Sequence, residues 1–129
     1  MARRSTQGER LVSIIKEHEL KRIIEVGVWK GTTKWHIFRE VNDEIECYWA
    51  IDLWDVLGEE HLKMSQLTRE DWDDKYKRVC LDMYYFSSLK VARLSSIETS
   101  TLFPNGYFDL VFIDANHFYD DVLEDIKTW

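Results

Sequence analysis

The sequence has little of what interrupts or cross-links a chain. It contains one proline and five glycines in 129 residues, and we find no repeat, low-complexity tract or internal linker. Of its two cysteines, neither Cys47 nor Cys80 has a second cysteine or a histidine at metal-ligand spacing. This favours two buried, reduced thiols over a disulfide framework or a zinc site. A single domain is expected.

Positive charge and long apolar runs are also scarce. Seventeen Lys and Arg residues stand against 24 Asp and Glu residues, which leaves a net charge of −7 and a pI near 5.1. This balance argues against nucleic-acid backbones and anionic membrane surfaces as partners. The two basic residues after Met1-Ala2 are followed by no apolar segment. We therefore expect a cytoplasmic protein with neither a signal peptide nor a transmembrane span.

Apolar residues are nevertheless abundant enough to form a core. Hydrophobic residues make up 45% of the chain and aromatic residues 14%. Apolar stretches that indicate strands alternate with helical patterns. The expected strands are 22–28, 46–52, 90–94 and 107–114, and the expected helices are 6–19, 31–41, 68–86, 96–102 and one from about 117. This alternation predicts an α/β fold with a parallel, doubly wound sheet.

The first predicted strand ends in a corner that contains an acid and two glycines. Glu25 lies inside the apolar run, and Gly27 and Gly31 follow it. Glycine lets the backbone approach a ligand closely, and the N–H groups of the next helix's first turn face that ligand. Because an acid is costly to bury without a partner, we interpret Glu25 as a ligand-binding residue. The glycines could alternatively serve only close packing of the strand against the helix.

Further acids end other predicted strands. Asp52 follows the second strand, and Asp114 follows the fourth. The carboxyl ends of parallel strands meet at one edge of the sheet, where ligands bind in such folds. We therefore expect Glu25, Asp52 and Asp114 to converge there with Gly27 and Ser96. Asp52 and Asp114 could instead cap the helices that follow them.

An acid after the second strand would also suit the ribose of NAD, so an NAD-dependent oxidoreductase is one alternative function. The dinucleotide fingerprint Gly-x-Gly-x-x-Gly is not met, because Trp29 stands where its second glycine would be. Close packing against a pyrophosphate is therefore disfavoured.

Taken together, the ordered motifs resemble class I S-adenosylmethionine-dependent methyltransferases, and most closely their family 24 branch. The likeness covers roughly residues 20–129 and is carried by Glu25-x-Gly27-x-x-x-Gly31, Asp52, Ser96-Ile-Glu98 and the run from Gly106 through Asp114-x-x-His117-x-Tyr119. It implies a Rossmann-like sheet with strand order 3-2-1-4. Residues 1–20 would form an N-terminal helix, and residues 21–129 would form the cofactor-binding βα units.

The resemblance also implies S-adenosylmethionine as cofactor and assigns roles to residues. The implied cofactor-binding residues are Glu25, Gly27, Val28, Trp29, Gly31, Asp52, Ser96, Ile97 and Asp114. Asp52 would accept hydrogen bonds from the ribose hydroxyls, and Ser96 and Ile97 would lie by the adenine. Asp114 and His117 would be the catalytic candidates on the acceptor side, since methylation of a hydroxyl needs a base. These two residues lack a third ligand for a metal, so none is expected.

The implied reaction is methyl transfer to a small hydroxylated acceptor, such as a sugar or a secondary metabolite. The family continues past the last predicted helix into further strands, whereas this sequence stops at Trp129. We therefore expect a C-terminally truncated domain, whose apolar fourth strand would be covered by a second copy or a partner chain. A non-catalytic Rossmann-like fragment that binds cofactor or pairs with a partner is the other alternative.

Overall fold

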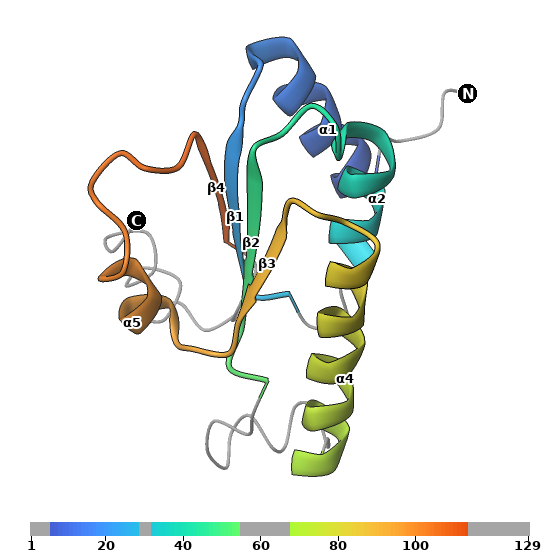
Figure 1. The fold of residues 1–129 in the computed structure, drawn as a ribbon, viewed down its shortest axis with the longest axis vertical. Helices are drawn as coiled ribbons and strands as arrows, with labels where there is room; N and C mark the ends of the chain where they lie inside the picture. The colour runs from blue at the N-terminus through green and yellow to red at the C-terminus, as the bar shows by residue number, and fades with distance from the viewer. Residues whose placement is uncertain (1–5, 29–31, 55–67, 114–129) are drawn as a thin grey trace.

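The computed structural model describes residues 6–28, 32–54 and 68–113. These residues form one sheet of four parallel strands in the order β3-β2-β1-β4. The strands are β1 (Arg22–Val26), β2 (Cys47–Ile51), β3 (Leu89–Ala92) and β4 (Leu110–Ile113). The predicted parallel sheet and its strand order are confirmed (Figure 1).

The described helices follow the predicted pattern, and side chains cap several of them. They are α1 (Gln7–His18), α2 (Thr32–Val41), α4 (Arg69–Leu81), the 3₁₀ helix η1 (Asp82–Tyr84) and α5 (Ser96–Ser100). Thr6 with Glu9 and Thr68 with Asp71 form capping boxes that supply hydrogen bonds to the first turns of α1 and α4. Ser95 caps α5 by accepting from the Glu98 N–H.

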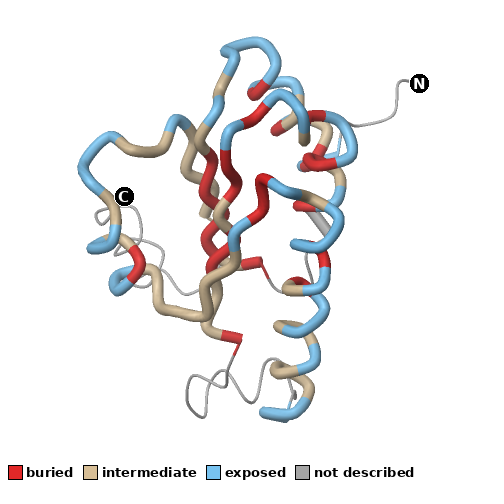
Figure 2. Tube along the Cα trace, in the orientation of Figure 1, coloured by how far each residue is buried: buried red, intermediate tan, exposed pale blue. Residues whose placement is uncertain are grey.

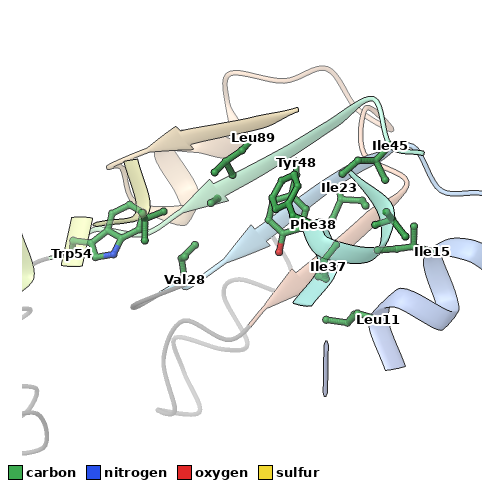
Figure 3. Packing of buried hydrophobic residues seen from close by; sticks show 13 residues of the cluster. Leu11, Ile15, Ile23, Val28, Ile37, Phe38, Ile45, Tyr48, Trp54 and Leu89 are labelled. Atoms are coloured by element: carbon green, nitrogen blue, oxygen red, sulfur yellow. The ribbon is translucent and has the colours of Figure 1, made fainter. Parts of the chain in front are cut away.

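The sheet is apolar on both faces, as expected for a parallel sheet. Helices α1, α2 and α4 lie on one face, and α5 lies on the other (Figure 1). Figure 3 shows the core on the first face, where side chains of α1 and α2 meet those of the strands. The buried residues concentrate along the central strands and the inner sides of these helices (Figure 2). Ile24, Val26 and Ile51 form a smaller buried cluster on the second face.

Two predicted boundaries differ most from the structure, and the others differ by about one or two residues. The long helix ends at Leu81 rather than at residue 86, and η1 follows it. Asp82, at the start of η1, is buried and pairs with Lys34 of α2, a tertiary requirement that no local pattern reveals. The fourth strand begins at Leu110 rather than at 107, after the Asp109 carboxylate has accepted two backbone N–H groups at the start of β1.

Both cysteines are free, as predicted. Cys47 is buried in β2, whereas Cys80 on α4 is only partly buried, so the expectation of burial is confirmed for one of the two. No helix in the described ranges is both long and apolar enough to span a membrane.

Candidate functional site

The corner after β1 requires a glycine. Gly27 has φ of 92°, a left-handed conformation that side chains other than glycine adopt only with strain. Its N–H donates to the Ile51 carbonyl at 2.8 Å, which continues the pairing with β2 one residue beyond β1. The chain therefore leaves the sheet at its carboxyl edge with no Cβ at this position.

The Asp52 carboxylate joins the ends of two strands at this edge. Its Oδ2 accepts from the Val28 N–H and its Oδ1 accepts from the Trp54 N–H, both at 2.9 Å. The Asp52 N–H donates to the Ala92 carbonyl at the end of β3, at 3.3 Å. These bonds hold the carboxylate in one orientation beside Gly27. They connect two loops and do not cap a described helix.

Glu25 has a partner inside the protein. It is 2% exposed and lies on the face of the sheet that carries Tyr48, whose hydroxyl donates to Glu25 Oε2 at 2.6 Å. Burial, together with the neighbouring negative charge of Glu25, raises the pKa of Tyr48 well above its ordinary value. Because Tyr48 is such a partner, the burial of Glu25 does not by itself call for a ligand, and its role in cofactor binding stays a prediction. Tyr48 was missed because the register of β1 and β2, which pairs it with Ile23 and so places it on the same face as Glu25, cannot be read from a local pattern.

Ser96 and Ile97 reach the same edge from β3. They are the first residues of α5, which begins shortly after β3 ends. Ser96 is partly buried, and the side chain of Ile97 is 45% exposed. The strand end from which this segment continues lies beside the end of β2, where the Asp52 N–H meets the Ala92 carbonyl.

Arg93 is a residue of this edge that sequence reasoning missed. Its Nε donates to the Leu53 carbonyl at 3.1 Å, and its Nη2 donates to the Trp54 carbonyl at 2.6 Å and to Asp73 Oδ1 at 2.5 Å. The bond from Arg93 is the main reason that the pKa of the Asp73 carboxyl is lowered. The predicted third strand, 90–94, includes Arg93, whereas in the structure Arg93 directly follows β3, and no local pattern indicates the carbonyls that it contacts.

A buried ion pair supports the helix behind the corner. Lys34, in the first turn of α2, is fully buried and pairs with Asp82 of η1. Its Nζ also lies 5.5 Å from the centre of the Trp35 ring. Such a pair is costly to break from one side, because the remaining charge stays buried. It attaches the start of α2 to the end of α4.

The structure places six of the predicted site residues at the carboxyl edge of the sheet: Glu25, Gly27, Val28, Asp52, Ser96 and Ile97. Hydrogen bonds join the Gly27–Val28 turn to β2 and to Asp52 directly. Trp29, Gly31, Asp114 and His117 lie outside the described residues. Within the described part of the chain, no group of three or more His, Cys, Asp or Glu side chains could hold a metal ion.

The parallel sheet has the strand order predicted above for a class I methyltransferase, and the comparison of families agrees. The chain belongs to the family 24 methyltransferase domains, because the model of that family matches residues 24–129. The predicted family is thereby confirmed. Among curated proteins, none matches the chain significantly.

Solved structures share the fold along nearly the whole chain. The cofactor-bound protein Rv0187 from MTB is 19% identical with a TM-score of 0.62, over 99% of this chain and 50% of that one. The O-methyltransferase TomG from Streptomyces achromogenes, in complex with SAM, is 18% identical with a TM-score of 0.62, over 98% and 50%. The SAH-bound methyltransferase PaMTH1 from Podospora anserina is 19% identical with a TM-score of 0.59, over 96% and 47%. The chain thus spans about half the length of each, and at these identities the likeness shows the Rossmann-like fold.

Proposed function

We propose that this chain binds S-adenosylmethionine at the carboxyl edge of its sheet and serves methyl transfer to a hydroxyl of a small acceptor, such as a sugar or a secondary metabolite. The observation that carries the proposal is the Asp52 carboxylate, held in one orientation by the Val28 and Trp54 amides beside the Cβ-free Gly27. Membership of a methyltransferase family supports it, as do the relatives of this fold that were crystallised with SAM or SAH.

The residues present suit the proposed cofactor. A carboxylate has two oxygens that together accept about four hydrogen bonds, which suits the two hydroxyls of a ribose. Glu25, Gly27 and Val28 would line the methionine and ribose side, with Trp29 and Gly31 of the same corner. Ser96 and the exposed Ile97 would lie by the adenine, to which Ile97 offers apolar surface.

The proposed reaction needs residues that bind and orient the cofactor and the acceptor, and a residue that accepts a proton. When bound, S-adenosylmethionine supplies a methyl group activated by a positively charged sulfur. The described residues bind and orient, which brings the acceptor oxygen into line with the methyl carbon. The proton of the acceptor hydroxyl must pass to a base. We assign that step to Asp114 and His117, both outside the described residues.

Calorimetric titration with S-adenosylhomocysteine tests the proposal. The unmodified chain should bind, and Asp52→Asn should bind at least about tenfold more weakly, because a charge-assisted hydrogen bond is worth about 1.5–3 kcal/mol. A folded chain that releases or takes up no heat at high micromolar ligand would contradict the proposed function. Thermal stabilisation by NAD instead of S-adenosylhomocysteine would favour the oxidoreductase alternative.

Asp109→Asn is the matched control for Asp52→Asn. Asp109 also accepts two backbone N–H groups, from Lys21 at 2.8 Å and Arg22 at 2.9 Å, but it does so at the opposite, amino edge of the sheet. Its substitution should reduce stability and leave the affinity for S-adenosylhomocysteine unchanged. Equal loss of affinity in both variants would show that Asp52 acts only through folding.

A further inference from the structure

Arg93 reaches from the end of β3 to the loop that follows β2. Two of its nitrogens donate to consecutive carbonyls, Nε to Leu53 and Nη2 to Trp54. Such a pair of bonds suits the planar guanidinium, whose donors have a fixed spacing, and does not suit a single ammonium group. The arginine therefore holds two successive peptide groups of one loop.

The loop after β2 contains a residue in an unfavourable backbone conformation. Trp54 has φ of 47°, in the left-handed region that a bulky side chain rarely adopts. Its side chain is fully buried, with its ring centre 5.2 Å from that of Tyr76 on α4. The surrounding structure must hold such a residue in place, because the backbone alone does not favour this conformation.

Trp54 connects Arg93 to Asp52. The N–H of Trp54 donates to Asp52 Oδ1, while the carbonyl of the same residue accepts from Arg93. A rotation of this residue toward ordinary backbone angles would therefore change both hydrogen bonds. The orientation of the Asp52 carboxylate depends on a residue that Arg93 holds.

The guanidinium is itself attached to α4. Asp73 accepts from its Nη2 at 2.5 Å, and its central carbon lies 4.9 Å from the centre of the Tyr76 ring. Arg93 thus links three elements, namely the end of β3, the loop after β2 and the first half of α4. Together these contacts hold the loop more firmly than a single ion pair at the surface would.

We propose that Arg93 is a positioning residue for the cofactor-binding edge: by holding the Leu53 and Trp54 carbonyls against α4, it keeps the Trp54 N–H on Asp52 and so orients the carboxylate that receives the ribose. The inference rests on the proposed function. In this arrangement Arg93 acts on Asp52 through Trp54.

Two measurements test the role. Amide hydrogen exchange of Trp54, followed by nuclear magnetic resonance without ligand, reports the loop itself. Calorimetry with S-adenosylhomocysteine reports the consequence for binding. In Arg93→Gln, we expect the Trp54 amide to exchange at least about tenfold faster and the affinity to fall about tenfold.

Further variants separate the effect of the paired hydrogen bonds of the guanidinium from the effect of its positive charge. Arg93→Lys keeps a cation near Asp73 but cannot donate to both carbonyls, so it should behave like Arg93→Gln. Asp73→Asn leaves the bonds to the carbonyls in place and should have a smaller effect. Restoration of both readouts by lysine would overturn the inference. Should Arg93→Gln fail to fold, Arg93→Lys and Asp73→Asn carry the comparison.

Arg22→Gln is a matched control. Arg22 also lies over a tyrosine ring, at 4.8 Å from the centre of Tyr107, and pairs with a carboxylate, Glu46, at 3.4 Å. It does so at the start of β1, at the other edge of the sheet. Its substitution should leave Trp54 exchange and ligand affinity unchanged.

The outcomes distinguish failure of this inference from failure of the proposed function. Equal exchange of the Trp54 amide in Arg93→Gln and Arg22→Gln overturns the inference, and so does equal affinity when the unmodified chain binds. If the unmodified chain does not bind S-adenosylhomocysteine, the proposed function is contradicted, and the inference about Arg93 is contradicted as well.

Discussion

At the scale of the residue, the contact between Glu25 and Tyr48 shows how this core accommodates an acid. The carboxylate is almost fully buried, and the tyrosine hydroxyl donates to it from the neighbouring strand. A buried carboxylate is tolerated only when such donors surround it. Tyr48 therefore contributes to the stability of the sheet directly below the corner that begins at Gly27.

Removal of this hydroxyl should be costly. Tyr48→Phe keeps the ring packed against Phe38 but removes a donor to Glu25, and we expect the free energy of unfolding to fall by about 1–3 kcal/mol. Urea denaturation measures the change. Tyr84→Phe is the control, because Tyr84 is 87% exposed and its substitution should change stability by less than about 0.5 kcal/mol. Equal effects in the two variants would contradict this account of Glu25.

At the scale of the element, two aspartates join neighbouring strands at opposite edges of the sheet. Asp52 connects the carboxyl ends of β1 and β2, and Asp109 connects the amino ends of β1 and β4. At the Asp109 end, the Asp109 N–H also donates to the Arg22 carbonyl at 2.8 Å. Each carboxylate thus satisfies backbone donors where the regular ladder begins or ends.

The amino-edge aspartate predicts a pH dependence of stability. Bonds from the Arg22 and Lys21 amides lower the pKa of Asp109 below its ordinary value of 3.8. Because the folded state binds the proton less readily than the unfolded state, the stabilisation is present above 3.8 and is lost as the pH falls through the folded pKa. Asp109→Asn should therefore be less stable than the unmodified chain at pH 7, by about 1 kcal/mol since the group is largely exposed to solvent screening.

This difference should shrink as the pH is lowered from about 5 toward 2, and urea denaturation across that range would measure it. Asp74→Asn, on the exposed side of α4, serves as the reference substitution. A difference between Asp109→Asn and the unmodified chain that stays constant with pH would contradict the role of its ionised carboxylate.

At the scale of the whole molecule, the edge formed by β4 matters most. In the described part of the chain, β4 is paired with β1 alone, and its four residues, Leu110–Ile113, are apolar and only partly buried. An apolar edge strand with unpaired backbone groups favours addition of another strand. We therefore propose that a second copy of the chain or a partner chain covers this edge.

Size-exclusion chromatography with light scattering tests this proposal. We expect a mass above the 15.5 kDa of one chain, and a mass that rises with concentration if the added strand comes from a second copy. A monomer that stays at 15.5 kDa up to high concentration would contradict it.

Local patterns were sufficient to predict the strands, their parallel arrangement and the corner at Gly27, because apolar runs and turn residues act over a few positions. The predicted end of the long helix and start of the fourth strand were wrong because contacts with distant residues set them. Lys34 pairs with Asp82 at the first, and the backbone at the start of β1 donates to Asp109 at the second. Within the candidate site, the acids at the ends of the strands could be predicted from the sequence, since the carboxyl ends of all parallel strands lie at the same edge of the sheet.

By itself, the sequence determined which residue types stand at that edge: an acid in β1, a glycine after it, Asp52 after β2 and Ser96 after β3. Only the tertiary structure decided what those residues contact. Tyr48 lies 23 positions from Glu25, the Val28 amide 24 positions from Asp52, and Arg93 lies 39 positions from the Trp54 carbonyl that it holds. Such contacts follow from register and packing, which bring together segments that local sequence patterns treat separately.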